Sequence, residues 1–375
     1  MLPFPFPFPF IDLRPVTRLV AEAAHRRWIG VLERCELVGG PGVEALERKL
    51  AAYCGTTTAV ACASGTDALV LALQAAGVRP GMHVALPNLT FWATFEAVVQ
   101  LGAIPVLIDI SPDDLQLDLE ELSRAHQAYR FRHAIVVHLY GWASNVLAEL
   151  RAFCQQHEIC LVEDAAQAAG VVLDGGPLLA EAEIATLSFY PAKVIGGCMD
   201  GGAVVTSDAA LAETVRSLGN HGRASHYSYR HVGWSSRMAG LQAHYLLEVL
   251  PHAEAIVADR RRQVAQYRAQ LDGICATLHG PGARITENGY LLVLACDQPA
   301  EPYVAQFRAR GIAVARTYPE TIDEQAPARG RFVAVSALAR SRAFVHRVLN
   351  LPLYYGMPDD ALGAVISAAR EILRR

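Results

Sequence analysis

Charged residues, membrane-spanning runs and paired cysteines are all scarce or missing in this chain of 375 residues. Only 19% of the residues are charged, the formal net charge is −4, and the basic residues form no stripe, so nothing indicates nucleic-acid binding. No apolar run is long enough to cross a membrane. The opening MLPFPFPFPF (1–10) lacks the basic start and leucine-rich core of a signal peptide, so we expect a cytoplasmic protein.

The 8 cysteines include no C-x-x-C pair, and most of them lie in apolar runs. A disulfide framework or a zinc site is therefore not expected, and we predict no bound metal. Buried, reduced thiols in a cytoplasmic protein fit the pattern better.

Proline and phenylalanine alternate in the opening segment, 1–10. Because this alternation cannot be helical, we expect an extended arm that lays its phenylalanine rings on an apolar surface, for example that of a partner subunit. A disordered end is the alternative.

Hydrophobic residues make up 52% of the chain, which is long enough for two lobes. In the first part, short runs that are apolar on successive residues alternate with helix-like segments such as 67–77 and 145–158. Such runs are typical of strands covered on both faces. The pattern predicts an α/β fold with a mostly parallel seven-stranded sheet flanked by helices. The predicted strands are 59–64, 83–88, 104–110, 134–141, 159–165, 185–190 and 202–206.

After Gly240 the regular alternation of short apolar runs and helix-like segments ends, and the sequence predicts a smaller α+β C-terminal domain. A long helix over 241–271, bent around Pro251, comes first. Two strand-like runs (290–296 and 312–317), a polar loop (318–331) and a closing helix (359–375) follow. We therefore expect an N-terminal arm and helix in 1–30, a large domain in 31–245 and a small domain in 246–375.

The ends of two predicted strands carry residues that suit a phosphate and a planar ring. Ligands sit at the carboxyl ends of strands in open parallel sheets. Gly65 and Thr66 open a helix after the first strand, and a helix start with small residues suits a phosphate, although an ordinary N-cap is the alternative. Phe91 or Trp92 follows the second strand and could stack on a planar ring, although core packing is the alternative.

Two later strand ends carry one acid and one amine. Asp164 ends a strand, and Gln167 follows it; a buried carboxylate there requires a cation, such as a protonated ring nitrogen, unless it caps the next helix. Ser188 ends another strand, and Lys193 follows among apolar residues, where an amine can act as a nucleophile and a proton carrier. A surface lysine is the alternative. Four features are thus present at the strand ends: a helix start for a phosphate, an aromatic side chain for stacking, a carboxylate for a ring nitrogen and an amine for a Schiff base. Together they provide what pyridoxal 5′-phosphate requires.

Nearly the whole chain resembles the DegT/DnrJ/StrS family of sugar aminotransferases, which have the type I fold of pyridoxal phosphate enzymes. The blocks that carry this resemblance include VHLYG (137–141), VEDAAQAAG (162–170), SFYPAKVIGGCMDGGAVVT (188–206), NHGR (220–223) and VGWSSRMAGLQA (232–243).

The resemblance implies a role for each matching residue. Lys193 would form the Schiff base, and Asp164 would pair with the pyridine nitrogen. Gln167 would contact the ring hydroxyl, and Phe91 would stack on the ring. The expected phosphate ligands are Gly65, Thr66, Ser188 and, from the neighbouring subunit of a homodimer with a shared active site, Ser235.

Several positions depart from the family pattern. Ser235 stands where the family usually has asparagine, and Ala239-Gly240 replaces the usual acidic pair. The stretch YPETIDEQ (318–325) lacks the histidine of many sugar-acting members. Since this stretch lies near the substrate in the family, the sugar is less well defined than the cofactor.

The resemblance implies a two-step transamination from glutamate to a keto-sugar, most simply one linked to a nucleotide. Tyr190, Arg237 and Tyr318 are the candidate substrate contacts. An aminotransferase acting on a cyclitol or another keto-sugar and a non-catalytic sensor or binding protein with the same fold are the alternatives. A related sugar dehydratase would carry histidine in place of Lys193.

Overall fold

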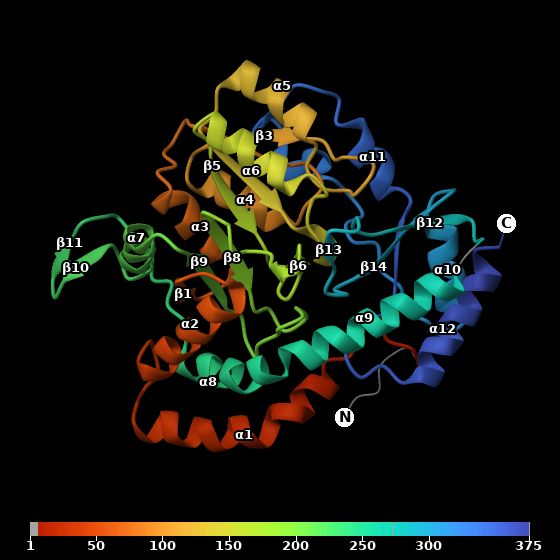
Figure 1. The fold of residues 1–375 in the computed structure, drawn as a ribbon, viewed down its shortest axis with the longest axis horizontal. Helices are drawn as coiled ribbons and strands as arrows, with labels where there is room; N and C mark the ends of the chain where they lie inside the picture. The colour runs from red at the N-terminus through yellow and green to blue at the C-terminus, as the bar shows by residue number, and fades with distance from the viewer. Residues whose placement is uncertain (1–6, 272, 375) are drawn as a thin grey trace.

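The computed structural model describes residues 7–271 and 273–374 (Figure 1). Its centre is a sheet of eight strands in the order β1-β9-β8-β5-β4-β2-β3-β15. The first seven in this order are the seven predicted strands, so the predicted α/β fold is confirmed, and the two-residue β15 adds an eighth. The strands are β1 (Thr58–Cys62), β2 (His83–Pro87), β3 (Ile104–Ile108), β4 (His133–Val137), β5 (Cys160–Asp164), β8 (Ile184–Ser188), β9 (Gly202–Thr206) and β15 (Val333–Ala334).

The sheet is mostly parallel. β9 runs antiparallel to both of its neighbours, β1 and β8, while β8, β5, β4, β2, β3 and β15 all run parallel. Because the strands are buried along nearly their whole length, both faces of the sheet are covered. The carboxyl ends of β2, β4, β5 and β8 therefore meet at one edge.

Helices cover the sheet, and local signals set several of their ends. The Ser64 hydroxyl accepts a hydrogen bond from the Asp67 backbone N–H and caps α3. Pro41 lies in the first turn of α2, and Gly55 ends that helix with a positive φ. The helices of this part are α1 (Arg14–Glu33), α2 (Pro41–Cys54), α3 (Gly65–Ala75), α4 (Trp92–Gln100), α5 (Leu119–Tyr129), α6 (Leu147–Gln156), α7 (Ala209–Gly219) and α8 (Gly240–Val249).

The predicted long helix bends where Pro251 interrupts it. α8 ends at Val249, one 3-10 turn covers Leu250–His252, and α9 (Ala253–Gln270) continues from there. Proline removes a backbone donor, which breaks the regular ladder of hydrogen bonds. Figure 1 shows α9 running from the large sheet to the C-terminal part of the chain, so this helix links the two.

The C-terminal part has its own sheet of three strands in the order β12-β14-β16. A second cluster of buried side chains lies between this sheet and α9, α10 and α12. The division of the chain at residue 245 stays a prediction. The elements are β12 (Ala276–His279), β14 (Leu292–Cys296), α10 (Glu301–Ala309), α11 (Ala339–Val345), β16 (Val348–Leu351) and α12 (Asp359–Ile372).

Two expectations for this part are wrong in detail. The run 312–317 forms no strand among the described residues: it pairs only through single bridges, between Ile312 and Phe8 and between Ala315 and Asn350. The polar loop 318–331 contains two 3-10 turns, Ile322–Glu324 and Ala326–Ala328. Thr321 and Glu324 form a capping box at the first turn, a local pattern that polar composition alone does not reveal.

Short pairings complete the architecture. β13 (Ile285–Thr286) joins β6 (Val172–Leu173) and β7 (Gly176–Pro177) in a small sheet, which connects the two parts of the chain. β10 (Arg223–Ser225) and β11 (Ser228–Tyr229) form a hairpin that extends from the body beyond α7 (Figure 1). No helix in the described part of the chain is long and apolar enough to cross a membrane.

The predicted N-terminal arm falls partly within the described residues. Phe8 exchanges backbone hydrogen bonds with Gly311 and Ala313, and its side chain packs on the C-terminal cluster. Phe10 packs against the larger core. The arm therefore lies on this chain's own surface, while its first part, 1–6, lies outside the described residues.

Candidate active site

One cavity of about 560 Å³ lies at the carboxyl edge of the large sheet. It collects residues that follow β1, β2, β5 and β8, together with two segments from the C-terminal part. The predicted site residues that line it are Gly65, Thr66, Phe91, Asp164, Gln167, Ser188, Tyr190, Lys193 and Tyr318.

A larger cavity, of about 620 Å³, lies between α2, the segment 168–179 and α9. Its walls are mostly small apolar residues, with Glu254 and Arg261 as the charged groups. None of the predicted site residues lines it. We take the smaller cavity as the candidate active site because, of these two cavities, only it combines a buried acid, a lysine and the start of a helix.

The start of α3 forms one wall of this smaller cavity. Gly65 lies so close to Ser188 that a Cβ atom at Gly65 would come within 2.7 Å of the Ser188 Cβ. Only glycine fits this approach, and it leaves the first N–H groups of the helix near the Ser188 hydroxyl. Such N–H groups have no partner inside the helix, and they suit an anion.

Asp164 is the buried acid of the cavity, with 4% of its surface exposed. Its carboxylate accepts hydrogen bonds from the Ala166 backbone N–H (3.0 Å) and the Thr94 hydroxyl (3.3 Å). Burial raises the pKa of Asp164, and these hydrogen bonds and the Lys193 charge only partly oppose that effect. A cationic ring nitrogen at this carboxylate would stabilise its ionised form.

Lys193 lies in the loop after β8. Its backbone N–H donates to the Tyr190 carbonyl at 2.8 Å, which closes a turn. The side chain lines the cavity, and its Nζ atom lies 5.2 Å from the centre of the Tyr290 ring. Lys193 is therefore not a surface lysine but part of the same cavity as Asp164.

Gln167 is held between two tyrosines. Its Oε1 accepts from the Tyr140 backbone N–H at 2.6 Å, and its Nε2 donates to the Tyr318 hydroxyl at 2.8 Å. The Tyr318 ring lies 5.9 Å from the Phe91 ring, with 35° between the planes. Phe91 keeps 54% of its surface exposed, so its ring remains free for a flat ligand at the mouth of the cavity.

Ser235 and Arg237 do not line the cavity of their own chain. Both are exposed, and Arg237 donates to the Ser235 hydroxyl (2.8 Å) and to the Asn220 side chain (3.1 Å). Their neighbour Ser236 is buried and donates to Asp67 on α3. The structure therefore separates Ser235 and Arg237 from the other predicted residues.

The cavity also contains residues that we did not predict from the sequence. Asp200, Tyr290 and Thr317 line it, and Thr94 supports Asp164. Thr94 follows the predicted aromatic pair in the sequence, but its bond to Asp164 depends on how α4 and β5 pack. Tyr290 opens a predicted strand, and nothing in the sequence indicates that the C-terminal part places it here.

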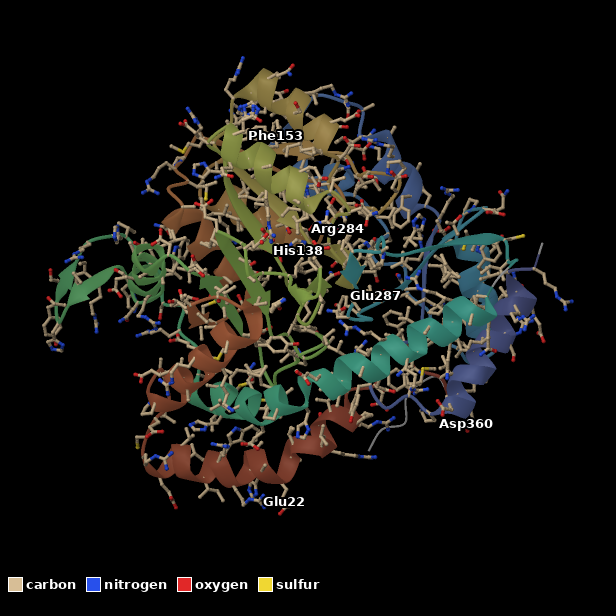
Figure 2. All side chains as sticks on the ribbon, in the orientation of Figure 1. Glu22, His138, Phe153, Arg284, Glu287 and Asp360 are labelled. Atoms are coloured by element: carbon tan, nitrogen blue, oxygen red, sulfur yellow. The ribbon has the colours of Figure 1, made fainter. Side chains whose placement is uncertain are left out.

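Glu163, which precedes Asp164 on β5, belongs to a buried cluster of charged side chains. His138 and Glu163 meet at 2.9 Å, and Arg151 donates to both oxygens of Glu163. Burial would raise the pKa of Glu163, but the bonds from His138 and Arg151 outweigh it and hold this pKa below its usual value. His138 is fully buried and is labelled near the centre of the molecule in Figure 2, whereas Glu22 and Asp360 lie at its edge. This group stabilises the ends of β4 and β5, which position the site.

The whole chain can now be compared with known proteins. Residues 20–370 match the DegT/DnrJ/EryC1/StrS aminotransferase family. A relative, dTDP-3-amino-3,4,6-trideoxy-alpha-D-glucose transaminase from Streptomyces venezuelae, is 34% identical over 98% of this chain and 96% of its own length.

Solved structures agree with this match. The crystal structure of S. venezuelae DesV in complex with a ketimine intermediate superimposes with a TM-score of 0.94 at 32% identity, covering 99% of this chain and all (100%) of the other. The structure of NtdA from Bacillus subtilis with bound cofactor PMP has a TM-score of 0.88 at 26% identity, covering 97% and 85%. The resemblance seen in the sequence motifs is thus confirmed, and the chain belongs to the DegT/DnrJ/EryC1/StrS aminotransferase family.

Proposed function

We propose that this aminotransferase moves an amino group from glutamate to a keto-sugar linked to a nucleotide, with pyridoxal 5′-phosphate as its cofactor. The observation that carries the proposal is the meeting of Lys193, Asp164 and the start of α3 in one cavity. The relative from Streptomyces venezuelae, named as a transaminase of a dTDP-linked amino sugar, supports a nucleotide-linked acceptor.

The residues of the cavity fit this cofactor. The close approach of Gly65 and Ser188 and the N–H groups of α3 suit its phosphate. Asp164 suits its ring nitrogen because the buried carboxylate requires a cation. When bound, pyridoxal phosphate supplies an aldehyde that accepts the amino group and a ring that withdraws electrons from the reacting carbon.

Side chains of this protein would bind the cofactor, transfer the proton and orient the ring and the substrate. Lys193 would hold the cofactor, and its freed amine would move a proton between the donor's α-carbon and the reacting carbon of the cofactor. Asp164 would hold a proton on the ring nitrogen, and the ring could then stabilise negative charge at the reacting carbon. Gln167 and Phe91 orient the ring, and Tyr190 and Tyr318 face the substrate.

We further propose that the active form is a homodimer in which Ser235 and Arg237 of one chain complete the site of the other. Both side chains are exposed and lie apart from their own cavity. The hairpin before them and the segment that follows it carry large exposed side chains, with Tyr227 81% and Val232 90% exposed. Exposed apolar groups that gather on a projecting element are typical of an interface. The free thiols fit a reducing compartment, so we place the dimer in the cytoplasm.

Replacing Lys193 with alanine tests the proposal. In the wild-type protein, glutamate should convert the visible absorbance of the bound cofactor to that of its amino form. Lys193→Ala should lose this conversion and all turnover, because it removes both the covalent link and the proton carrier. Lys49→Arg, at an exposed position on α2, is the matched control and should behave as wild type. Normal turnover by the alanine variant would contradict the assignment.

A further inference from the structure

We propose that Tyr290 is a positioning residue for the reacting lysine: its ring holds the Lys193 ammonium group in the cavity whenever that amine is not bonded to the cofactor. This inference rests on the proposed function, because it takes Lys193 as the reacting amine. The Nζ atom lies 5.2 Å from the ring centre. A cation within about 6 Å of an aromatic ring centre is attracted to the ring face.

The ring suits this task better than an acid would. Among residues 7–271 and 273–374, Lys193 takes part in no ion pair, although Asp164 is near enough for the two charges to interact. A carboxylate in contact would hold the ammonium proton through a strong charge-assisted hydrogen bond. A ring face attracts the cation but takes no proton, so the amine stays in place and can still exchange its proton with a substrate.

The backbone around Tyr290 is tied to the large sheet. The buried Asn288 side chain donates to the Gln167 carbonyl (2.8 Å) and the Ala169 carbonyl (2.9 Å). Its oxygen accepts from the Tyr290 backbone N–H at 2.9 Å. One amide therefore connects Tyr290 to the segment that carries Gln167.

A buried guanidinium holds the same segment from the other side. Arg260 donates from Nη1 to the carbonyls of Gly289 (3.1 Å) and Tyr290 (3.4 Å), and to that of Leu353 (3.2 Å). Burial lowers the pKa of Arg260 to about 10, so it remains charged at neutral pH.

Gly141 leaves the space that Tyr290 occupies. A Cβ atom on Gly141 would come within 2.8 Å of the Tyr290 Cβ, and the φ of 98° at Gly141 also favours glycine. Contacts from three separate segments thus converge on the position of one ring.

The sequence allows a direct test, because lysine occurs only at Lys49 and Lys193. The full-length, cofactor-free protein, labelled with carbon-13 at the lysine ε-carbon, should give two NMR signals, which Lys49→Arg assigns. Protons above a ring face are shielded, so we expect the Lys193 signal upfield of the exposed Lys49 signal. Tyr290→Phe should keep this upfield shift, and Tyr290→Leu should lose it.

The kinetic effect should follow the same pattern. Loss of the ring face should slow turnover by about 3- to 30-fold in Tyr290→Leu, whereas Tyr290→Phe should stay within about twofold of wild type. A Lys193 signal at the Lys49 position in wild type would overturn the inference, even if Tyr290→Leu fails to fold. An upfield signal in a protein whose cofactor absorbance does not respond to glutamate would instead overturn the proposed function.

Discussion

A carboxyl group that is buried away from any contacting cation is costly to ionise, and Asp164 is in this position while no cofactor is bound. Its two hydrogen bonds come from a backbone N–H and a hydroxyl, which are both neutral donors. The raised pKa of Asp164 follows from burial. A group whose pKa is raised by folding stabilises the folded state while it is protonated, and this stabilisation is lost as the pH rises through the folded-state value.

Asp164→Asn should therefore stabilise the cofactor-free protein near neutral pH by about 1 kcal/mol, because it removes a buried charge and keeps the shape. The gain should be larger at about pH 8 than at about pH 5, since the raised pKa makes ionisation of the buried wild-type carboxyl more costly as the pH rises. Denaturant unfolding at both pH values measures the difference.

The same Asp164→Asn variant should lose turnover by about 100-fold, because it can no longer stabilise the ring nitrogen's charge. Asp200→Asn, at an exposed acid of the same cavity, is the control and should change the free energy of unfolding by less than about 0.5 kcal/mol. Equal stability effects in the two variants would count against the desolvation of Asp164.

At the scale of elements, the segment that carries Tyr318 is fastened to the end of β2. The buried Asn88 side chain donates to Asp323 (2.8 Å) and Ser341 (2.9 Å) and accepts from the Asp323 backbone N–H (3.1 Å). Arg342 adds an ion pair with Asp323. Tyr318 is thus kept over the cavity by residues that do not themselves line it.

Asn88→Ala should destabilise the protein by about 2 kcal/mol, because it leaves the buried polar groups of Asp323 and Ser341 with fewer partners. It should also raise the KM for the sugar more than it lowers kcat, since the Tyr318 segment would be less ordered. Gln325→Ala, which removes an exposed bond to Glu320, is the control with little expected effect. Unfolding curves and initial rates measure both, and an unchanged KM would contradict this role.

The sequence predicts the large sheet well because its strands are unbroken apolar runs. The prediction of strands from the sequence fails where a strand forms only by pairing with a segment that is distant in the sequence. The run 312–317 begins with four apolar residues, yet Phe8 and Asn350 give it only single bridges. β15 is two residues long and is a strand only because β3 lies beside it.

In the candidate site, too, residues next to recognisable strands could be predicted, whereas residues brought in by distant segments could not. Gly65, Asp164 and Lys193 follow strands whose ends are recognisable in the sequence, so their meeting could be predicted. Tyr290 and Asp200 could not, because neither position carries a residue pattern that identifies a site. The cavity position of Tyr290 depends on how the C-terminal part docks on the sheet.

At the scale of the whole molecule, one chain does not hold all the predicted site residues in one place. The cavity contains Lys193 and Asp164, whereas Ser235 and Arg237 face outward beside the start of α3. In a symmetric dimer, each outward segment would serve the other chain's cavity.

Mixing two inactive variants should then restore activity. Lys193→Ala lacks the proposed reacting amine, and a Ser235→Ala/Arg237→Ala double variant lacks the proposed contacts of the outward segment. If chains exchange freely at equal amounts, half of the dimers are mixed and one of their two sites is intact, which gives about a quarter of the wild-type activity. Unfolding the two variants together and refolding them provides the exchange.

Each variant refolded alone should stay inactive and serves as the control. A mixture with no more activity than its components would show that each chain builds its site from its own residues.

The pairing of β15 with β3 also has a consequence for the order in which the chain is made. β3 would otherwise form an open edge of the large sheet, and its cover comes from residues 333–334, which are translated long after β3 itself. A nascent chain paused before that point exposes backbone groups that can recruit strands from neighbouring nascent chains. Synthesis of residues 333–334, and not merely of the strands of the large sheet before them, thus protects the nascent chain from aggregating at the ribosome.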